Sequence, residues 1–512
     1  MDMLAATNAH APSLLWVWPF VAILLSIALL PLIHRTAHWW ENNASKLFVS
    51  LVLAAVTLLY YGLRDTGIPV HAEHASADAR TPADAHVETH PESAAIHVET
   101  RTADGAERAP HTPRSAPGLP TVVKVLEHAV LAEYVPFIVL LFSLYVITGG
   151  ILVRGDLRAT PLVNTTILAT GGVLASFVGT TGAAMLLIRF LLKTNAERRR
   201  KVHTVVFFIF IVANIGGTLL PIGDPPLFLG YLRGVPFLWT LHLWKEWAFM
   251  LVCILSVYLL WDIRAYRHEA PADIRLDETQ RQPLRVAGLI NVLWLLGVVV
   301  AVGTLDPSKA FPGSEALLGR PWHAPPYLRE GVQLLMVVLS LATTPRGLRP
   351  ENQFNYVAIG EVAALFIGIF ITMQVPIEIL HARGAELGLT RPWQFFWATG
   401  MLSSFLDNAP TYVVYFETAV SLPHETIIGA LGAVDPVHLP GGRDLPFSLL
   451  AAISCGAVFM GANTYIGNGP NFMVKAIAEQ SGVKMPSFFG YMLYSMFILI
   501  PLFVVLTLVF FR

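Results

Sequence analysis

Long apolar runs separated by short polar segments dominate the chain of 512 residues. Each run is about 20 residues long, the length that an α-helix needs to cross roughly 30 Å of hydrocarbon. The first run, Leu14 to Ile33, follows no Lys or Arg and is too long for a signal peptide, so we predict an uncleaved span. The ten predicted spanning segments start near Leu14, Leu47, Val125, His203, Phe237, Arg285, Gly331, Val357, Phe447 and Phe488.

Two further apolar stretches, Leu162–Leu192 and Gln394–Leu422, have centres rich in Gly, Pro, Asn and Thr. Each is about 30 residues long, so a straight helix would overshoot the bilayer. We predict re-entrant hairpins, in which two half-helices meet at a polar tip inside the protein or beside a water-filled cavity. The alternative of two full spans leaves the flanks of each stretch on the same side, so loop charge alone does not decide between them.

Basic residues in the loops indicate the orientation of the chain. The cluster from Lys193 to Lys201 and the pair Arg154 and Arg158 flank the first hairpin, and both are predicted to be cytoplasmic. Counting onward places Arg264–Arg285 and Arg346–Arg349 inside as well. The second hairpin then enters from outside, and both termini are external.

Composition supports a membrane protein. Hydrophobic residues make up 54% of the chain and charged residues only 13%, whereas a soluble domain carries about 25% charged residues. The formal net charge of −1 offers nothing that would attract nucleic acid. Cys253 and Cys455 both lie in apolar stretches and do not imply a disulfide. We therefore expect an all-α, multi-pass protein of the cell inner membrane, with the lipid bilayer as its main partner.

The segment from Asp65 to Pro120 is rich in Ala, Glu, Asp, Thr, Pro and His and nearly free of large apolar residues. It cannot bury a core, so we predict a disordered external loop. Metal binding or pH sensing by its histidines is the alternative to a solvated low-complexity loop. The histidines concerned are His71, His74, His86, His90, His97 and His111.

The two predicted hairpins resemble each other in sequence, which indicates an internal repeat. Gly172, Leu174, Ser176 and Phe177 of the first match Gly400, Leu402, Ser404 and Phe405 of the second, which aligns the tips Gly179–Gly182 and Asp407–Pro410. The span after each hairpin repeats too: Ala213-Asn214 recurs as Ala462-Asn463 at a shorter spacing, and Pro221–Phe228 recurs as Tyr465–Phe472. The hairpins enter from opposite sides, so the copies are inverted, an architecture typical of secondary transporters.

The repeat predicts five regions along the chain. They are N-terminal transmembrane helices (1–64), the His-rich external loop (65–120), a first transport repeat (121–284), a linking helix with an external loop (285–330), and a second, inverted repeat (331–512).

Broken helices within the repeats predict the ion site. A helix interrupted at Ile222-Gly-Asp-Pro-Pro226 frees backbone carbonyls and exposes half-helix ends that carry partial charge near the middle of the membrane. Such carbonyls, with Asn, Thr and Ser side chains, can replace the hydration shell of Na⁺. The predicted ion-binding residues are Thr180, Thr181, Asn214, Asp224, Asp407, Asn408, Asn463, Thr464, Asn468 and Asn471.

Ionisable residues at membrane depth are costly and usually functional. Asp407 is the leading carboxylate for competition between Na⁺ and H⁺, with Asn408 and Asn463 as further Na⁺ ligands; Asp224 is the second proton-coupling candidate. Capping of the following half-helix is the alternative role for both aspartates.

Three further ionisable residues lie at or near the membrane. Glu361 is predicted either to pair with another helix or to relay protons. Arg189 and Glu417 occupy nearly equivalent places in the two hairpins and are expected near the interfaces, as anchors or pairs.

At these motifs the sequence resembles the ion transporter superfamily, which holds NhaD-type sodium/proton antiporters, arsenite efflux permeases and citrate and dicarboxylate carriers. Ser404–Pro410 looks like the NhaD-type hairpin motif. Phe207–Pro236 and Gly461–Pro486 look like a branch named for sodium:proton antiport or citrate transport. The resemblance covers roughly Val125 to the C-terminus. The sequence departs from NhaD proteins at Pro225-Pro226, where threonines are common, and the tips lack the Ser-Asn-Thr of dicarboxylate carriers.

The leading functional prediction is a secondary active antiporter that exchanges Na⁺ or Li⁺ for H⁺ and needs no cofactor. The alternative is a Na⁺- or H⁺-coupled transporter of citrate or another organic anion, and anion efflux of the arsenite type ranks third. An intramembrane aspartyl protease is disfavoured because no Tyr-Asp occurs, and the absence of a Gly-x-x-x-x-Gly-Lys-Ser/Thr loop disfavours direct drive by ATP. The resemblance also implies a homodimer, since members of the superfamily are often dimers.

Overall fold

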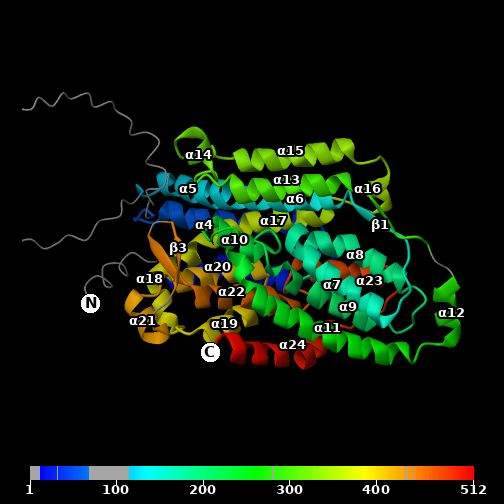
Figure 1. The fold of residues 1–512 in the computed structure, drawn as a ribbon. Helices are drawn as coiled ribbons and strands as arrows, with labels where there is room; N and C mark the ends of the chain where they lie inside the picture. The colour runs from blue at the N-terminus through cyan, green and yellow to red at the C-terminus, as the bar shows by residue number, and fades with distance from the viewer. Residues whose placement is uncertain (1–11, 32, 69–114, 280–281, 433–434, 441) are drawn as a thin grey trace, which may run out of the picture.

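The computed structural model describes residues 12–31, 33–68, 115–279, 282–432, 435–440 and 442–512, and the structure of these residues is mainly helical (Figure 1). The six histidines of the predicted external loop, between positions 71 and 111, lie outside the described residues. Among the described residues the helices fall into two groups that lie one above the other in the view of Figure 1.

The upper group, called the frame from here on, is built from the first helices of the chain and those before the second hairpin. In it α4 packs against α2 and α17, and α6 packs against α13 and α15. Its main elements are η1 (Leu14–Val17), α2 (Trp18–Leu29), α3 (His34–Trp40), α4 (Asn43–Leu63), α5 (Leu119–Leu126), η3 (Glu127–Tyr134), α6 (Val135–Thr148), α13 (Ile290–Thr304), α15 (Leu328–Thr343) and α17 (Val357–Thr372). The helix α18 (Gln374–Arg383) continues α17 and is counted with the frame for that reason, although in Figure 1 it lies in the lower group, where it packs against α20.

The lower group, called the hairpin body from here on, contains both predicted hairpins and both predicted broken helices. In it α7 packs against α8 and α11, and α20 packs against α10, α19 and α22. Its elements are α7 (Pro161–Val178), α8 (Thr180–Thr194), α9 (Val202–Ile211), η4 (Ile215–Thr218), α10 (Pro225–Leu232), η5 (Trp239–Leu243), α11 (Trp244–Tyr266), α19 (Pro392–Phe405), α20 (Asn408–Val420), α22 (Phe447–Met460), η7 (Gly461–Asn463), α23 (Gly469–Gln480) and α24 (Phe488–Phe510).

Short elements close the two ends of the molecule. Two antiparallel ribbons, β1 with β2 and β3 with β4, pair Leu152 with Ala287 and Pro436 with Pro446. The remaining elements are β1 (Leu152–Arg154), β2 (Arg285–Ala287), β3 (Pro436–Leu439), β4 (Arg443–Pro446), α12 (Pro271–Thr279), α14 (Ser314–Leu318), α16 (Leu348–Glu351), η6 (Gly384–Leu387) and α21 (His424–Leu431).

Each of the ten predicted spanning segments contains an apolar helix, and the all-α membrane prediction is confirmed. Among the described residues six helices are long and apolar enough to cross a membrane; five of them fall in predicted spans, and the sixth, Pro161–Val178, is the first arm of the first predicted hairpin. Four shorter apolar helices fall in other predicted spans, and the span predicted near Gly331 contains α15 (Leu328–Thr343). One predicted start is wrong: Arg285 opens a β-strand rather than a span, because residues 285–287 pair with β1, and the helix begins at Ile290.

The structure shows the two hairpins as helical pairs of opposite direction. The arms α19 and α20 have 14 and 13 residues, about 20 Å each at 1.5 Å per residue, which is less than the roughly 30 Å of hydrocarbon. In the first hairpin α8 has 15 residues, but α7 has 18 and is long and apolar enough to cross a membrane, so arm length supports a re-entrant hairpin for the second stretch only. The tip of the first hairpin ends inside the protein, where Thr180 N–H donates to the Gly223 carbonyl at 2.8 Å. Figure 1 shows α8 toward the end that carries α12 and α16, and α20 toward the end that carries β3 and α21.

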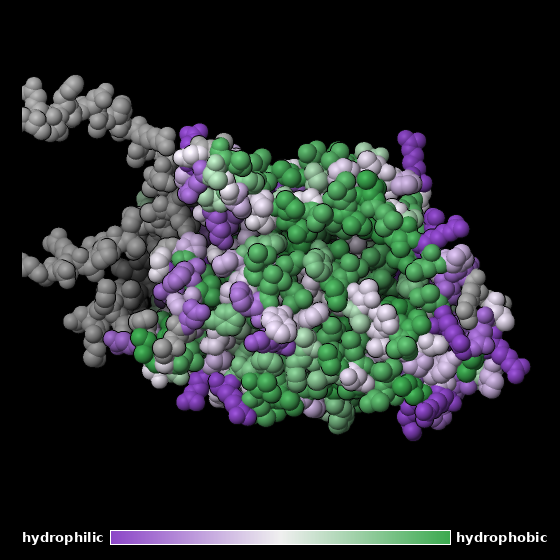
Figure 2. All heavy atoms as spheres, in the orientation of Figure 1, coloured by the Kyte–Doolittle hydropathy of each residue, from purple (hydrophilic) through white to green (hydrophobic). Residues whose placement is uncertain are grey.

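The outer surface fits a protein embedded in lipid. Figure 2 shows a broad band of apolar residues over the face in view, with hydrophilic residues gathered at its two ends. Side chains of α13 and α15 such as Leu293, Leu296 and Val338 are more than half exposed. An apolar surface of this extent fits a multi-pass membrane protein, whose outer face contacts lipid rather than water.

Part of the basic segment 193–201 is folded back onto the hairpin body. The Arg198 guanidinium is buried and donates to both carboxylate oxygens of Asp262, at 2.9 and 2.6 Å. His203, at the start of α9, also contacts Asp262, with 2.8 Å from Nε2 to Oδ1. These contacts attach the start of the broken helix α9 to the end of α11.

Candidate functional site

Both broken helices are built around a close contact between two glycines. A Cβ on Gly223 would lie 2.3 Å from the Gly217 carbonyl oxygen, and a Cβ on Gly467 would lie 2.5 Å from that of Gly461. The two glycine pairs have the same spacing in the sequence. No larger residue fits such a backbone approach, so this pair of glycines defines equivalent positions in the two halves.

Serines in the hairpins attach each tip to its break. Ser176 Oγ donates to the Gly216 carbonyl at 2.5 Å. Ser404 Oγ lies 3.1 Å from the Met460 carbonyl, which shares the hydroxyl proton with the Gly400 carbonyl of the serine's own helix at 2.8 Å. Gly216 and Met460 are each the residue before the first glycine of the pair. The predicted match of the two hairpins through these serines is therefore supported by their shared contacts.

One match in the predicted repeat is wrong. The glycine contacts align Gly217 with Gly461, so Asn214 falls opposite Val458 and Asn463 falls opposite Leu219. The recurrence of Ala-Asn at a shorter spacing is coincidental, because the backbone geometry, which requires no gap, decides the equivalence. The match of Asp224 with Asn468 has the same register as the glycines and stands.

Asp224 lies at the centre of the site and is 1% exposed. Its carboxylate accepts hydrogen bonds from Thr180 Oγ1 at 2.9 Å, Asn408 Nδ2 at 2.6 Å and Asn468 Nδ2 at 3.1 Å. These donors come from the first tip, the second tip and the second break. Asp224 occupies the N-cap position of α10 but makes no cap hydrogen bond with its side chain, so the capping alternative does not describe it.

An amide network surrounds the second break. Asn214 Nδ2 donates to Asn471 Oδ1 at 2.7 Å, and Asn468 Nδ2 lies 3.2 Å from Asn214 Oδ1. Asn471 Nδ2 donates to the carbonyls of Gly461 and Thr464, each at 2.9 Å. The predicted ion-binding asparagines thus form one connected cluster with Asp224.

Asp407 is held differently from Asp224. It is half-buried at the N-cap position of α20, and its side chain makes no cap hydrogen bond. The N-terminus of α20, which carries positive partial charge, still begins directly after it. The backbone N–H groups of Asn408 and Ala409 lie beside the Asp407 carboxylate, so this carboxylate faces the positive end of α20.

Two buried amide oxygens, one in the second tip and one in the second break, have no donor among the described residues. They are Oδ1 of Asn408 and Oδ1 of Asn463. The other amide atom of each residue is bonded: Asn408 Nδ2 to Asp224, and Asn463 Nδ2 to Ser404 Oγ at 2.9 Å. These bonds orient both free oxygens, and an unpaired buried acceptor is costly unless a ligand or water supplies its partner.

Of the predicted threonines Thr464 and Thr181, only Thr464 forms a hydrogen bond within the cluster of described residues. Thr464 belongs to the second break, where its hydroxyl donates to the Ser404 carbonyl at 2.5 Å. Thr181 is half-buried beside the first tip, and none of the recorded hydrogen bonds of the cluster involves it.

Glu361 lies outside the cluster. Its carboxylate forms an ion pair with Lys46 of α4, with 2.8 Å between Nζ and Oε1. Of the two predicted roles, pairing with another helix is therefore confirmed.

The charge of the cluster is negative. Asp224 is the carboxylate of its hydrogen-bonded side chains, which are otherwise amides and hydroxyls. Asp407 is a second carboxylate, directly before Asn408 of the cluster. Among the described residues no group of three or more His, Cys, Asp and Glu side chains could hold a metal ion.

The sequence did not reveal a buried ion network near the site. Arg233, at the end of α10, lies between Glu133 of η3 and Glu417 of α20, at 2.5 and 3.0 Å. The expectation that Glu417 forms a pair is confirmed, although the residue is buried rather than an anchor at the surface. The only sequence signal for Arg233 was a lone basic residue directly after the apolar half-helix.

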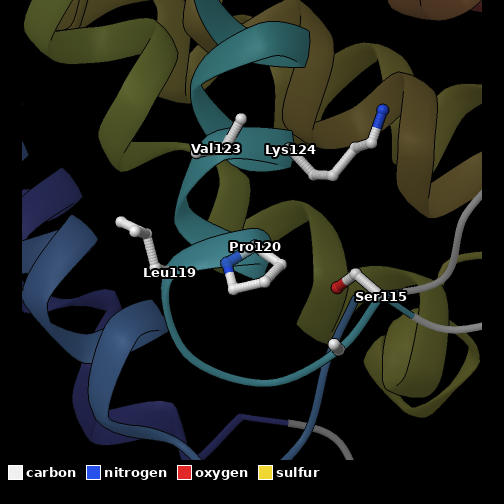
Figure 3. Close-up of a pocket in the computed structure, with 6 residues that line it drawn as sticks. Ser115, Leu119, Pro120, Val123 and Lys124 are labelled. Carbon is white, nitrogen blue, oxygen red and sulfur yellow. The ribbon is translucent and has the colours of Figure 1, made fainter.

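A surface depression at the start of α5 is separate from this cluster. Figure 3 shows it lined by Ser115, Leu119, Pro120, Val123 and Lys124. None of these side chains takes part in the hydrogen bonds of Asp224 or its neighbours.

One family model matches nearly the whole chain. It is CitMHS_2, described as "Putative citrate transport", and it matches residues 9–77 and 114–511. No curated protein matches the chain. The match includes both hairpins, both broken helices and every residue of the cluster around Asp224.

Proposed function

The chain belongs to this citrate transport family, and from that premise we propose that it is a cation-coupled secondary transporter that exchanges Na⁺ for H⁺ across the cell inner membrane. The coupling site is formed by Asp407, Asn408 and Asn463. Asp224 supports this site through its bond to Asn408.

The unpaired amide oxygens carry this proposal. Oδ1 of Asn408 and Oδ1 of Asn463 are buried without a donor among the described residues. Asn408 directly follows Asp407 in the chain, and Asn463 donates to Ser404, three residues before Asp407. Two neutral oxygens and one carboxylate oxygen can replace part of the hydration shell of Na⁺, as carbonyls do in ion pathways. A ring nitrogen or thiolate, which a softer metal would prefer, is not among these groups.

Exchange follows if Asp407 carries either ion but not both. The carboxylate binds Na⁺ when ionised and a proton when neutral, so release of one on the far side allows uptake of the other. A buried charge at membrane depth is costly when it is uncompensated. The site is therefore least able to change its access from one side to the other when Asp407 is ionised and empty. This keeps the Na⁺ flux coupled to the H⁺ flux.

The family description favours a second function, Na⁺- or H⁺-coupled transport of citrate. Asp224 and Asp407 would repel a citrate anion, and no basic side chain takes part in the recorded hydrogen bonds of the cluster. Citrate would therefore have to enter together with cations that occupy the same oxygens.

The test uses purified protein reconstituted into vesicles that contain a pH-sensitive dye. Outward gradients of Na⁺, Li⁺, K⁺ or choline are imposed with and without external citrate, and uptake of labelled citrate is followed in parallel. We expect an outward Na⁺ gradient to acidify the lumen without citrate, and Asp407→Asn to abolish this signal while the protein still elutes as a folded species.

A different result would overturn Na⁺/H⁺ exchange. If labelled citrate is taken up only with Na⁺, and protons do not move when citrate is absent, the protein is a coupled citrate transporter. Normal Na⁺/H⁺ exchange in Asp407→Asn would show that the coupling carboxylate lies elsewhere.

A further inference from the structure

Arg233 lies buried between two glutamates from distant parts of the chain. Its Nη2 is 2.5 Å from Glu133 Oε1, its Nε is 3.0 Å from Glu417 Oε1, and the three side chains are at most 7% exposed. Buried charges of this kind add little to stability over well-packed apolar residues, so their presence calls for a role beyond holding the fold together.

Arg233 and Glu417 belong to the half-helices that begin at the two aspartates of the site. Arg233 ends α10, which starts after Asp224, and Glu417 lies in α20, which starts after Asp407. The two half-helices are in close contact, since a Cβ on Gly230 would lie 2.3 Å from Tyr412 Oη. Both aspartates and both ion-pair residues therefore belong to one packed unit.

The partners of this unit belong to the frame. Glu133 lies in η3, a π-helical stretch that interrupts the long helix from α5 to α6, and its other oxygen accepts from Gln374 Nε2 at 3.1 Å. His381 of α18 lies 2.8 Å from Glu417 Oε2. Two polar contacts, Arg233 with Glu133 and Glu417 with His381, thus cross from the hairpin body to the frame. π-helical stretches often occur at functional sites.

We propose that Arg233 and Glu417 form a latch that docks the aspartate-bearing half-helices onto Glu133 and His381 of the frame and that opens during each transport cycle. The proposal rests on the proposed transport function but not on which ion or anion is carried. The Arg233–Glu417 pair lies within the moving unit and persists, whereas the two contacts with the frame separate.

A latch changes the balance between two conformations and leaves each binding site intact. Weakening it lowers the population of the docked state, so the apparent affinity rises on the side served by the other state and falls on the side served by the docked state. A defect in the site itself would instead weaken binding from both sides. Opposite shifts in KM on the two faces therefore distinguish a latch from a purely structural ion network.

The test compares Glu133→Gln and His381→Gln, which weaken the latch from two different helices, with Glu127→Gln as the matched control. Glu127 also belongs to η3, but its recorded ion pair is an exposed one with Lys124 of the same helix. KM is measured from both sides of oriented vesicles, with whichever cargo the wild-type protein moves. We expect about fivefold shifts in opposite directions for both latch variants and none for the control.

Hydrogen exchange provides a readout that needs no cargo. Backbone amides at the end of α10 and in η3 should exchange faster in both latch variants than in the control, because the docked faces separate more often. KM shifts of the same sign on both faces, or unchanged exchange in folded His381→Gln, would overturn the latch. Absence of any transport by the wild-type protein would instead overturn the proposed function, and the exchange measurement would then decide on the latch.

Discussion

The first break contains one carboxylate among apolar side chains, whereas the second contains several amide and hydroxyl side chains and no carboxylate. The glycine contacts place Asp224 opposite Asn468. At the other equivalent positions the first half has Leu219, Leu220 and Leu227, where the second has Asn463, Thr464 and Asn471. The two halves thus share their backbone contacts, while their chemistry is divided between them.

The two tips differ in the opposite sense, because here the second half has the carboxylate. Gly179 stands where the second hairpin has Asp407, and it has a φ of 80°, which favours glycine. Thr180 and Asn408, the next residues, both donate to Asp224. Both tips therefore converge on the carboxylate of the first break, and the second tip adds a carboxylate of its own. The site consequently has two inequivalent acids, one held by three side-chain donors and one without a cap bond.

The largest expected effect separates these two acids. In Asp224→Asn an amide group would face the donors Thr180, Asn408 and Asn468, so at least one donor would lose its acceptor, at a cost of about 1–3 kcal/mol. We expect transport to be lost and thermal stability in detergent to fall. Asp407→Asn should abolish transport with little change in stability, because the Asp407 side chain makes no cap bond. An equal loss of stability in both variants would contradict the difference between the two acids.

Exchanging the equivalent residues gives the next largest effect. Asn468→Asp alone would place two carboxylates where Asn468 now donates to Asp224 at 3.1 Å, so we expect a severe loss of folded protein. In the double variant Asp224→Asn with Asn468→Asp, the amide at position 224 would donate to the carboxylate at position 468, which reverses the present hydrogen bond. It should recover part of the stability lost in Asp224→Asn but not the transport rate. Yields and unfolding temperatures of the two single variants and the double variant measure this.

The paired glycines test what the two halves share. Gly223→Ala and Gly467→Ala each force a Cβ to within 2.3 and 2.5 Å of a facing carbonyl oxygen. We expect similar destabilisation, about 1–3 kcal/mol each, as for other overpacked sites. Gly469→Ala, for which the added Cβ would meet nothing within 4 Å, is the control. If only one of the two alanine variants kept its stability, the two backbones would not be equivalent.

The smallest effect concerns the first tip. Thr180→Val keeps the shape of the side chain but removes one of the three donors to Asp224, so we expect a loss of about 1 kcal/mol and a several-fold rise in KM. Thr181→Val should change stability by no more than about 0.5 kcal/mol, because no hydrogen bond of the cluster involves Thr181. Comparable effects on KM in both variants would restore Thr181 as an ion ligand, as its position in the sequence predicted.

Much of the site was accessible from local sequence. Asp224 and Asp407 were found because each directly precedes a half-helix inside an apolar run, where a charge is conspicuous. Thr180, Asn408 and Asn468 were also predicted as site residues, from the tips and the second break. Their hydrogen bonds to Asp224 could not be predicted in this way, since the three residues lie 44, 184 and 244 residues from it. The wrong match of Asn214 with Asn463 has a similar cause: a repeated dipeptide contains no information about which backbone atoms approach each other.

By itself the sequence determined the spans and the two hairpins, because the thickness of hydrocarbon and the need to satisfy backbone groups act on segment length and local composition. Only the tertiary structure decided the register of the two halves, the donors around Asp224, and the pairing of Arg233 with Glu133 and Glu417. These depend on close approach between elements far apart in the chain. Inside a membrane, polar groups form such contacts because hydrocarbon offers them no other partner.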